Sequence, residues 1–329
     1  MSNKIFSISS AFVLGASFAV ADVPKVAVDI APVHSLVSKV MNGLGKPNLI
    51  IPSEASPHEY QLRPSEAKAL QEANLVFWIG EDLTPWLEKG LSTLAKDATI
   101  TTLLKAEGIE LLDFREGALF EAHDHSDHDD HDDHDDHDHG KHKKKDHHDD
   151  HAGHEGHDHG EHDPHAWLSP SIAKAWLNLI AAKLSEVDPN NASTYFSNAS
   201  SAIKDLDTLS DEINKILDPI RKEKFVVFHD AYQYFENHFN ISASGAISLG
   251  DASDPSPARL KEIKERVEKE DIHCVLAEPQ YNEGLVKAVI EGTHANNAII
   301  DPLGVSLEIG PNLYDKLIRN LAINLSNCF

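Results

Sequence analysis

The chain has 329 residues, which at roughly 150 residues per domain is enough for two domains, each with its own core. Its 54 Asp and Glu residues outnumber its 29 Lys and Arg residues, and the formal net charge is -25. A charge of this sign repels nucleic acid phosphates and anionic lipid headgroups. The composition therefore argues against nucleic acid binding and favours cationic partners.

The first 21 residues have the pattern of an export signal. Lys4 precedes an apolar run from Ile5 to Val20, and small residues at 19 and 21 form a cleavage site. We therefore predict a signal peptide over residues 1–21 and a protein that reaches the periplasm or is secreted. A retained membrane anchor is the alternative, but serines interrupt this run and it is too short to span a bilayer comfortably. No later segment approaches the roughly 20 apolar residues of a spanning helix.

Two groups of short β-branched runs follow, and each alternates with helical patterns. Such alternation is typical of strand-helix-strand units with parallel sheets. The predicted strands begin at Lys25, Asn48 and Asn74 in the first half, and at Lys224, His273 and Asn297 in the second. The sequence thus predicts an α/β fold of two parallel-sheet lobes.

Helices are predicted between these strands and between the two groups. The apolar spacing favours helices over residues 65–73, 171–187, 192–217 and 256–270. The 192–217 helix would be roughly 39 Å long, enough to join two lobes, unless it breaks into two shorter helices near residues 205–210. We expect an N-terminal lobe over 22–187, a linking helix over 188–217 and a C-terminal lobe over 218–329.

The segment 121–163 is unlike the rest of the chain. It holds 15 of the 22 histidines and 14 aspartates, with almost no apolar residues. Such a segment buries too little apolar surface to offset the entropy of ordering, so we predict a disordered loop. Imidazoles crowded beside carboxylates favour several weak metal sites, although a simple acidic spacer is the alternative.

The two cysteines, Cys274 and Cys328, are an even number in a chain predicted to be exported. An oxidising compartment lets a disulfide form and persist, so we expect these residues to pair. Two buried free thiols are the alternative.

Ligands of open α/β sheets bind beyond the carboxyl ends of the strands, and several polar residues fall there. His229 and Glu278 directly follow predicted strands, Asp301 ends another, and His58 lies six residues beyond Pro52. His165 precedes a helix for which we predict Ser169 as N-cap and Pro170 as first residue. Three histidines with a carboxylate or water make a complete tetrahedral set for Zn²⁺, although each alone also suits a hydrogen-bonded or surface histidine.

Five segments carry a resemblance to a known family. The stretches "ASPHEYQLRPSEAKALQEANLVFWIG", "DPHAWLSP", "FVVFHDAYQYF", "CVLAEPQ" and "IIDPLG" resemble, in order, motifs of the ZnuA-type periplasmic zinc-binding proteins of ABC transporters. The acidic histidine-rich insertion and the placing of the cysteine pair resemble that family too. The resemblance implies two α/β lobes joined by one long rigid helix, with the metal in the cleft between them.

Carried over residue by residue, the resemblance implies His58, His165 and His229 as zinc ligands. Manganese-binding members have an acidic residue at the position of His229, so the histidine favours zinc. Some zinc members have Glu directly before the first histidine, where this chain has Pro57. The fourth ligand is then Asp301 or water, and Asp301 alternatively orients another ligand.

The function implied is capture of Zn²⁺ in the periplasm and delivery to an inner-membrane ABC permease with its ATPase. The protein is then not an enzyme. A manganese or iron receptor of the same architecture, and an adhesin or metal buffer, are alternatives. So is a zinc hydrolase with Glu278 as general base, although no Gly-x-Ser-x-Gly motif is present.

Overall fold

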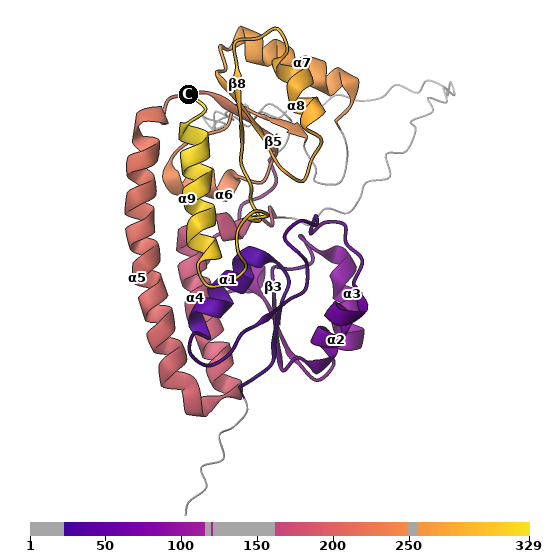
Figure 1. The fold of residues 1–329 in the computed structure, drawn as a ribbon, viewed down its shortest axis with the longest axis vertical. Helices are drawn as coiled ribbons and strands as arrows, with labels where there is room; N and C mark the ends of the chain where they lie inside the picture. The colour runs from indigo at the N-terminus through magenta and orange to yellow at the C-terminus, as the bar shows by residue number, and fades with distance from the viewer. Residues whose placement is uncertain (1–22, 116–119, 121–161, 249–254) are drawn as a thin grey trace, which may run out of the picture.

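The computed structural model describes residues 23–115, 120, 162–248 and 255–329. The predicted signal peptide and residues 121–161 of the predicted loop lie outside this range. Two lobes stack along the long axis of the molecule, and helices run beside both of them (Figure 1). In the described part of the chain, no helix is long and apolar enough to cross a bilayer.

The N-terminal sheet has four parallel strands in the order β2-β1-β3-β4. Its strands are β1 (Val26–Val28), β2 (Asn48–Leu49), β3 (Leu75–Trp78) and β4 (Thr99–Thr102). The helices of this half are α1 (Ala31–Val40), α2 (Pro64–Glu72), α3 (Pro85–Leu94) and the 3₁₀ turn η1 (Leu103–Lys105). Strand β4 was not predicted, because it is an edge strand whose threonine-rich sequence has no apolar run.

The C-terminal sheet has the same form, with the order β6-β5-β7-β8 and all strands parallel. Its strands are β5 (Phe225–His229), β6 (Ala246–Ser248), β7 (Cys274–Ala277) and β8 (Asn296–Ile299). The helices are α6 (Gln233–Phe239), α7 (Pro257–Lys269), α8 (Glu283–Ile290) and α9 (Leu313–Ser326). The short edge strand β6 was not predicted either.

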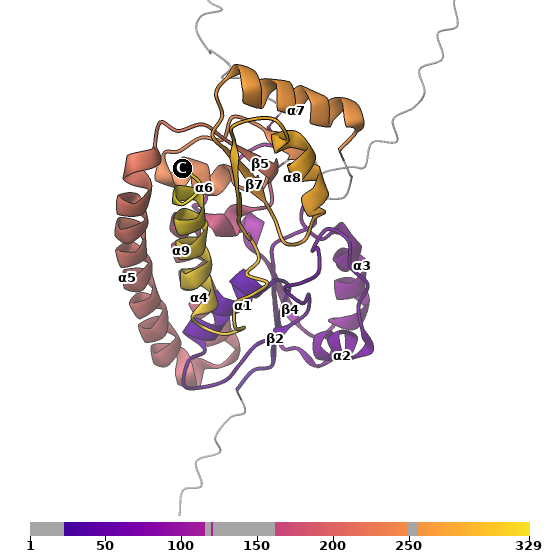
Figure 2. The same ribbon diagram turned by 45° about the horizontal axis from the view of Figure 1, so that its top comes forward.

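The middle of the chain is helical. Its elements are η2 (Ala166–Leu168), α4 (Pro170–Val187), η3 (Pro189–Asn191), α5 (Ala192–Leu217) and η4 (Asp218–Ile220). The prediction of one unbroken 192–217 helix is confirmed, as is the start of α4 with Ser169 as N-cap and Pro170 as first residue. Helix α5 runs past both lobes, and Figure 2 shows it beside α9 from a second direction.

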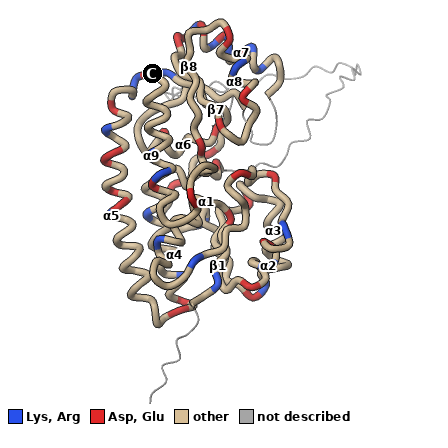
Figure 3. Tube along the Cα trace, in the orientation of Figure 1, with Lys and Arg blue, Asp and Glu red and all other residues tan. Residues whose placement is uncertain are grey.

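The apolar pattern that predicts the 192–217 helix consists of Phe196, Ala199, Ile203, Leu206, Leu209, Ile213 and Ile216, and the buried face of α5 differs in part from this set. Tyr195, Ala202 and Leu217 are buried on it, whereas Phe196 is 48% exposed. The buried Tyr195 hydroxyl donates to Asp188 Oδ2 at 2.8 Å, and this bond supports the observed rotation of the helix. Charged residues of the described chain lie on helices such as α5 and α7 and on loops, and none lies in a strand (Figure 3).

Helix α9 is a second connection between the lobes, and this connection was not predicted. Its N-terminal end packs on α1, where Ser35 Oγ accepts from the Tyr314 backbone N–H at 3.0 Å and Lys39 pairs with Asp315 at 2.9 Å. Its C-terminal end is followed by Cys328, which forms the predicted disulfide with Cys274 at the start of β7. The N-terminal end of α9 is thus fixed to the N-terminal lobe, and its C-terminal end is fixed to the C-terminal lobe.

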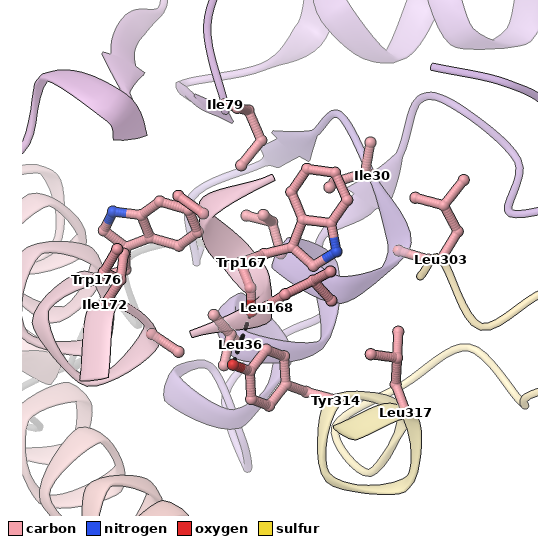
Figure 4. Close-up of a cluster of buried hydrophobic side chains, with 14 of the residues drawn as sticks. Ile30, Leu36, Ile79, Trp167, Leu168, Ile172, Trp176, Leu303, Tyr314 and Leu317 are labelled. Carbon is pink, nitrogen blue, oxygen red and sulfur yellow. Dashed lines mark hydrogen bonds between the residues drawn. The ribbon is translucent and has the colours of Figure 1, made fainter. Parts of the chain in front are cut away.

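The core is continuous from one sheet to the other. One hydrophobic cluster contains residues of both sheets and of α1, α4, α5 and α9. At its centre, Trp167 lies among Ile30, Leu303 and Tyr314, and Tyr314 Oη donates to the Trp167 carbonyl at 2.8 Å (Figure 4). A smaller cluster lies between the C-terminal sheet and helices α7 and α8. The lobes are therefore packed on each other as well as linked by helices.

Candidate metal-binding site

The carboxyl ends of β5 and β7 place His229 beside Glu278. His229 is the last residue of β5, and Glu278 directly follows β7, the neighbouring parallel strand. His229 Nδ1 lies 2.7 Å from Glu278 Oε1, and both side chains are less than 5% exposed. A neutral imidazole that donates from Nδ1 to a carboxylate carries its lone pair on Nε2, which is the nitrogen that can bind a metal.

His165 has a similar arrangement in the segment that enters α4. Asp163 Oδ1 accepts from the backbone N–H of His165 at 2.9 Å and lies 2.7 Å from its ring Nδ1. The Asp163 backbone is itself held, since its N–H donates to the Leu112 carbonyl and its carbonyl accepts from Tyr234 Oη. His165 is 2% exposed, so both its ring orientation and its tautomer are set by buried neighbours.

His58 comes from the N-terminal lobe, in the loop between β2 and α2. Its side chain is half-buried, and the Nε2 atom is shielded from solvent. The carbonyl of the preceding Pro57 accepts a hydrogen bond from Trp86 Nε1 of α3 at 2.8 Å. His58 is therefore presented by a loop that is attached to a helix rather than by a strand end.

The three imidazoles converge from three separate segments. The ring centre of His165 lies 5.7 Å from that of His58 and 5.3 Å from that of His229. An ion 2.0–2.1 Å from each Nε2, with tetrahedral angles, places ring centres about 5.2 Å apart. Over the described residues, no three His, Cys, Asp or Glu side chains already form a metal cluster.

The histidines line a small pocket between the lobes. Its volume is about 20 Å³, enough for one water molecule or one ion. Its lining residues are Ser56, Pro57, His58, His165, Trp167, His229, Glu278, Gln280, Tyr281, Pro302 and Leu303. Larger hollows elsewhere on the molecule contain neither His58, His165 nor His229. The pocket is far smaller than the roughly 300 Å³ or more of a typical organic ligand site.

Asp301 is placed differently from the histidines. Its Oδ1 accepts from the backbone N–H groups of Leu303 and Gly304 at 3.0 and 2.9 Å and from Gln280 Nε2 at 3.2 Å, and its Oδ2 accepts from the Val305 N–H. Asp301 is not among the residues that line the pocket. In this arrangement the carboxylate fixes the turn after β8, and the next two residues of that turn form part of the pocket wall.

A second cluster of charges lies directly behind His229. Arg115 makes hydrogen bonds to both carboxylate oxygens of Asp230 and to both of Glu236, with 18% or less of each side chain exposed. Burial raises the pKa of Asp230, and the Arg115 guanidinium opposes that rise. Burial also raises the pKa of Tyr232 well above its usual value, and the Glu278 charge adds to the effect. These neighbours hold the end of β5 in place.

Two of these supporting residues, Asp163 and Arg115, were not predicted from the sequence. Asp163 falls within the predicted disordered loop, but the structure orders it and buries it to 1% exposure, so the loop boundary at 163 is wrong. The Asp-Pro-His spacing at 163–165 is the signal that could have found it. Nothing in the sequence connects Arg115 with Asp230, because their contact arises only from the fold.

Comparison with known proteins identifies the family. The sequence profile described as "Zinc-uptake complex component A periplasmic" matches residues 26–328. The high-affinity zinc uptake system protein ZnuA of Brucella abortus (strain 2308) is 46% identical over 303 residues, 92% of this chain and 91% of that protein. The protein of the same name from Paracoccus denitrificans (strain Pd 1222) is 44% identical over 309 residues, 94% of this chain and 92% of that protein.

Solved structures agree in fold. A structure described as "Crystal structure of ZnuA" has a TM-score of 0.72 at 22% identity and covers 93% of this chain and 99% of its own. A second, described as a "138-173 ZnuA deletion mutant plus zinc bound", has a TM-score of 0.71 at 22% identity, with 93% and 98% covered. The profile match over nearly the whole chain and the relatives above 40% identity lead to one conclusion: the chain belongs to the family of periplasmic A components of zinc-uptake complexes.

Proposed function

We propose that His58, His165 and His229 bind one Zn²⁺ ion as cargo in the pocket between the lobes. The observation that carries the proposal is the convergence of three imidazoles on a pocket of about 20 Å³, two of them oriented by buried carboxylates. Nitrogen donors suit Zn²⁺, whereas manganese prefers sites richer in oxygen. The two carboxylates also supply negative charge that balances the ion.

We infer that water completes the site and that Asp301 has an orienting role. Both Asp301 oxygens already accept hydrogen bonds, three of them from the backbone of its own turn. To bind the ion, Asp301 would have to give up part of this turn. A water ligand requires no such rearrangement of the turn.

The geometry argues against a zinc hydrolase. Glu278, the candidate general base, has one oxygen bonded to His229 Nδ1, and the pocket has no room for an organic substrate. The relatives are zinc-uptake proteins and not enzymes. The proposed role is capture of Zn²⁺ in the periplasm and delivery to a cognate ABC permease powered by its ATPase.

Zinc titration in competition with a chromophoric chelator tests the site. The triple variant with His58, His165 and His229 changed to Ala should lose the tight site, because no imidazole ligand remains in the pocket. His294→Ala is the matched control, since this histidine is exposed and outside the pocket. A tight site that survives the triple substitution would overturn the proposal.

Growth under zinc limitation tests delivery. A strain without this protein should fail to grow in chelator-treated medium, and the wild-type chain or the His294→Ala control should restore growth. The triple variant should not. Equal rescue by the triple variant would separate growth from the site and refute the transport role.

We also propose that the histidine-rich segment binds additional Zn²⁺ weakly. Its 15 histidines lie among carboxylates in residues 121–163. Deleting residues 121–160 should remove weak, exchanging sites and leave the tight site, because His165 and Asp163 remain. Isothermal titration of the two forms would detect the difference, and equal stoichiometry would contradict it.

A further inference from the structure

The loop that carries His58 differs from the segments that carry the other two histidines. His229 ends a strand, and its position follows from the register of the sheet. The chain from residue 50 to residue 63 contains neither helix nor strand, and His58 lies near its middle. Some other contact must therefore fix His58 relative to the pocket.

A side chain of α3 makes that contact on the N-terminal side of His58. Trp86 Nε1 donates to the Pro57 carbonyl at 2.8 Å. That carbonyl and the His58 N–H belong to the same planar peptide unit. The hydrogen bond thus orients the peptide plane that joins Pro57 to the Cα atom of His58.

The same indole also contacts the chain on the C-terminal side of His58. The Tyr60 ring meets the Trp86 ring edge-on, with centres 5.9 Å apart. Tyr60 Oη donates to Glu66 Oε1 at 2.8 Å, and Glu66 Oε2 accepts from the Arg63 backbone N–H at 2.7 Å at the start of α2. His58 therefore lies between two points that Trp86 touches.

We propose that Trp86 is a positioning residue for zinc binding, acting through the Pro57 carbonyl to hold His58 at the pocket. The inference rests on the proposed zinc site. Trp86 does not line the pocket, so it affects zinc only through His58. Loss of its hydrogen bond lets the loop adopt more conformations, and zinc binding must then order it again. Partners behind metal ligands typically change affinity by about 10–100-fold.

A double-mutant cycle tests the proposal on the full chain. Zinc affinity is measured by chelator competition for wild type, Trp86→Phe, His58→Ala and the double variant. Trp86→Phe keeps an aromatic ring and removes the donor, and it should weaken zinc binding about tenfold. In the His58→Ala background the same substitution should have no effect, because the residue it positions is gone.

Trp176→Phe is the matched control. Its indole donates to the Leu103 carbonyl at 3.0 Å in the core, away from the pocket, and should not couple to His58. If Trp86→Phe weakens zinc binding equally in both backgrounds, or not at all, the positioning role is refuted. If His58→Ala leaves zinc affinity unchanged, the proposed site itself is wrong. Melting of the metal-free variants shows whether each has folded.

Discussion

The bond between Glu278 and His229 allows the proposed site to be tested without removing a ligand. The two atoms are 2.7 Å apart and buried. Because the acceptor is a carboxylate, the hydrogen bond is stronger than one to a neutral oxygen. Glu278→Gln keeps the shape and an oxygen acceptor but removes the charge. The difference between a charged and a neutral hydrogen bond is about 1–1.5 kcal/mol, which corresponds to a roughly tenfold loss of zinc affinity. Glu278→Ala also frees the ring and should cost up to about 100-fold.

The assay is chelator competition at pH 7, with melting of the metal-free and zinc-bound forms. The stabilisation that saturating zinc gives should shrink by about 1.4 kcal/mol in Glu278→Gln. Metal-free melting is recorded for each variant, because the bond to His229 is present without zinc and its weakening also lowers the stability of the metal-free protein. The control is Glu212→Gln on α5, which changes a carboxylate paired with Arg319 of α9. Unchanged affinity in both Glu278 variants would refute the orienting role.

Three further predictions concern stability. Arg115→Met leaves two buried carboxylates without their partner and should lower the free energy of unfolding by about 3–5 kcal/mol in urea titrations, whereas a loss below 1 kcal/mol would contradict a buried ion cluster. Burial lowers the pKa of His34 and His238 in the folded protein. Below about pH 6.5 the unfolded chain binds protons at these two histidines and the folded protein does not, so the metal-free protein should lose stability as the pH falls. The double variant with His34 and His238 changed to Gln should lose less stability over the same pH range. An equal loss would show that other groups cause the pH dependence. Changing Cys274 and Cys328 to Ala should cost about 2–4 kcal/mol in the same titrations, and no loss would mean that the disulfide adds nothing.

The sequence predicted the architecture because the buried strands and long helices carry strong periodic patterns. The 192–217 helix was found with its observed bounds, and six of the strands were located. The missed strands, β4 and β6, lie at sheet edges, where short or polar sequences suffice. Phe196 was placed on the wrong face of α5 because apolar spacing alone fits more than one rotation of that helix.

The candidate site was predictable in part. His229 and Glu278 follow from one rule about strand ends, and His58 and His165 needed the family resemblance as well. The residues that hold His58 and His165 in place were not predicted from the sequence. Asp163 was hidden in a segment whose composition indicates disorder, and Trp86 is 28 positions along the chain from His58. Such partners depend on how elements pack, which a linear pattern does not contain.

The continuous core limits how the proposed zinc pocket can open. Trp167 is 1% exposed at the junction of the lobes, and its Nε1 donates to the Pro302 carbonyl at 2.8 Å. Wide separation of the lobes would expose this ring, at a cost of about 5 kcal/mol for roughly 200 Å² of apolar surface. Most side chains of residues 52–63 are half-buried or exposed, so we expect movement of the His58 loop to expose less apolar surface. We therefore expect X-ray scattering of the metal-free and zinc-bound forms to give nearly equal radii of gyration, with differences confined to residues 50–63 in hydrogen exchange. A large compaction on zinc binding would show instead that the lobes separate at this junction.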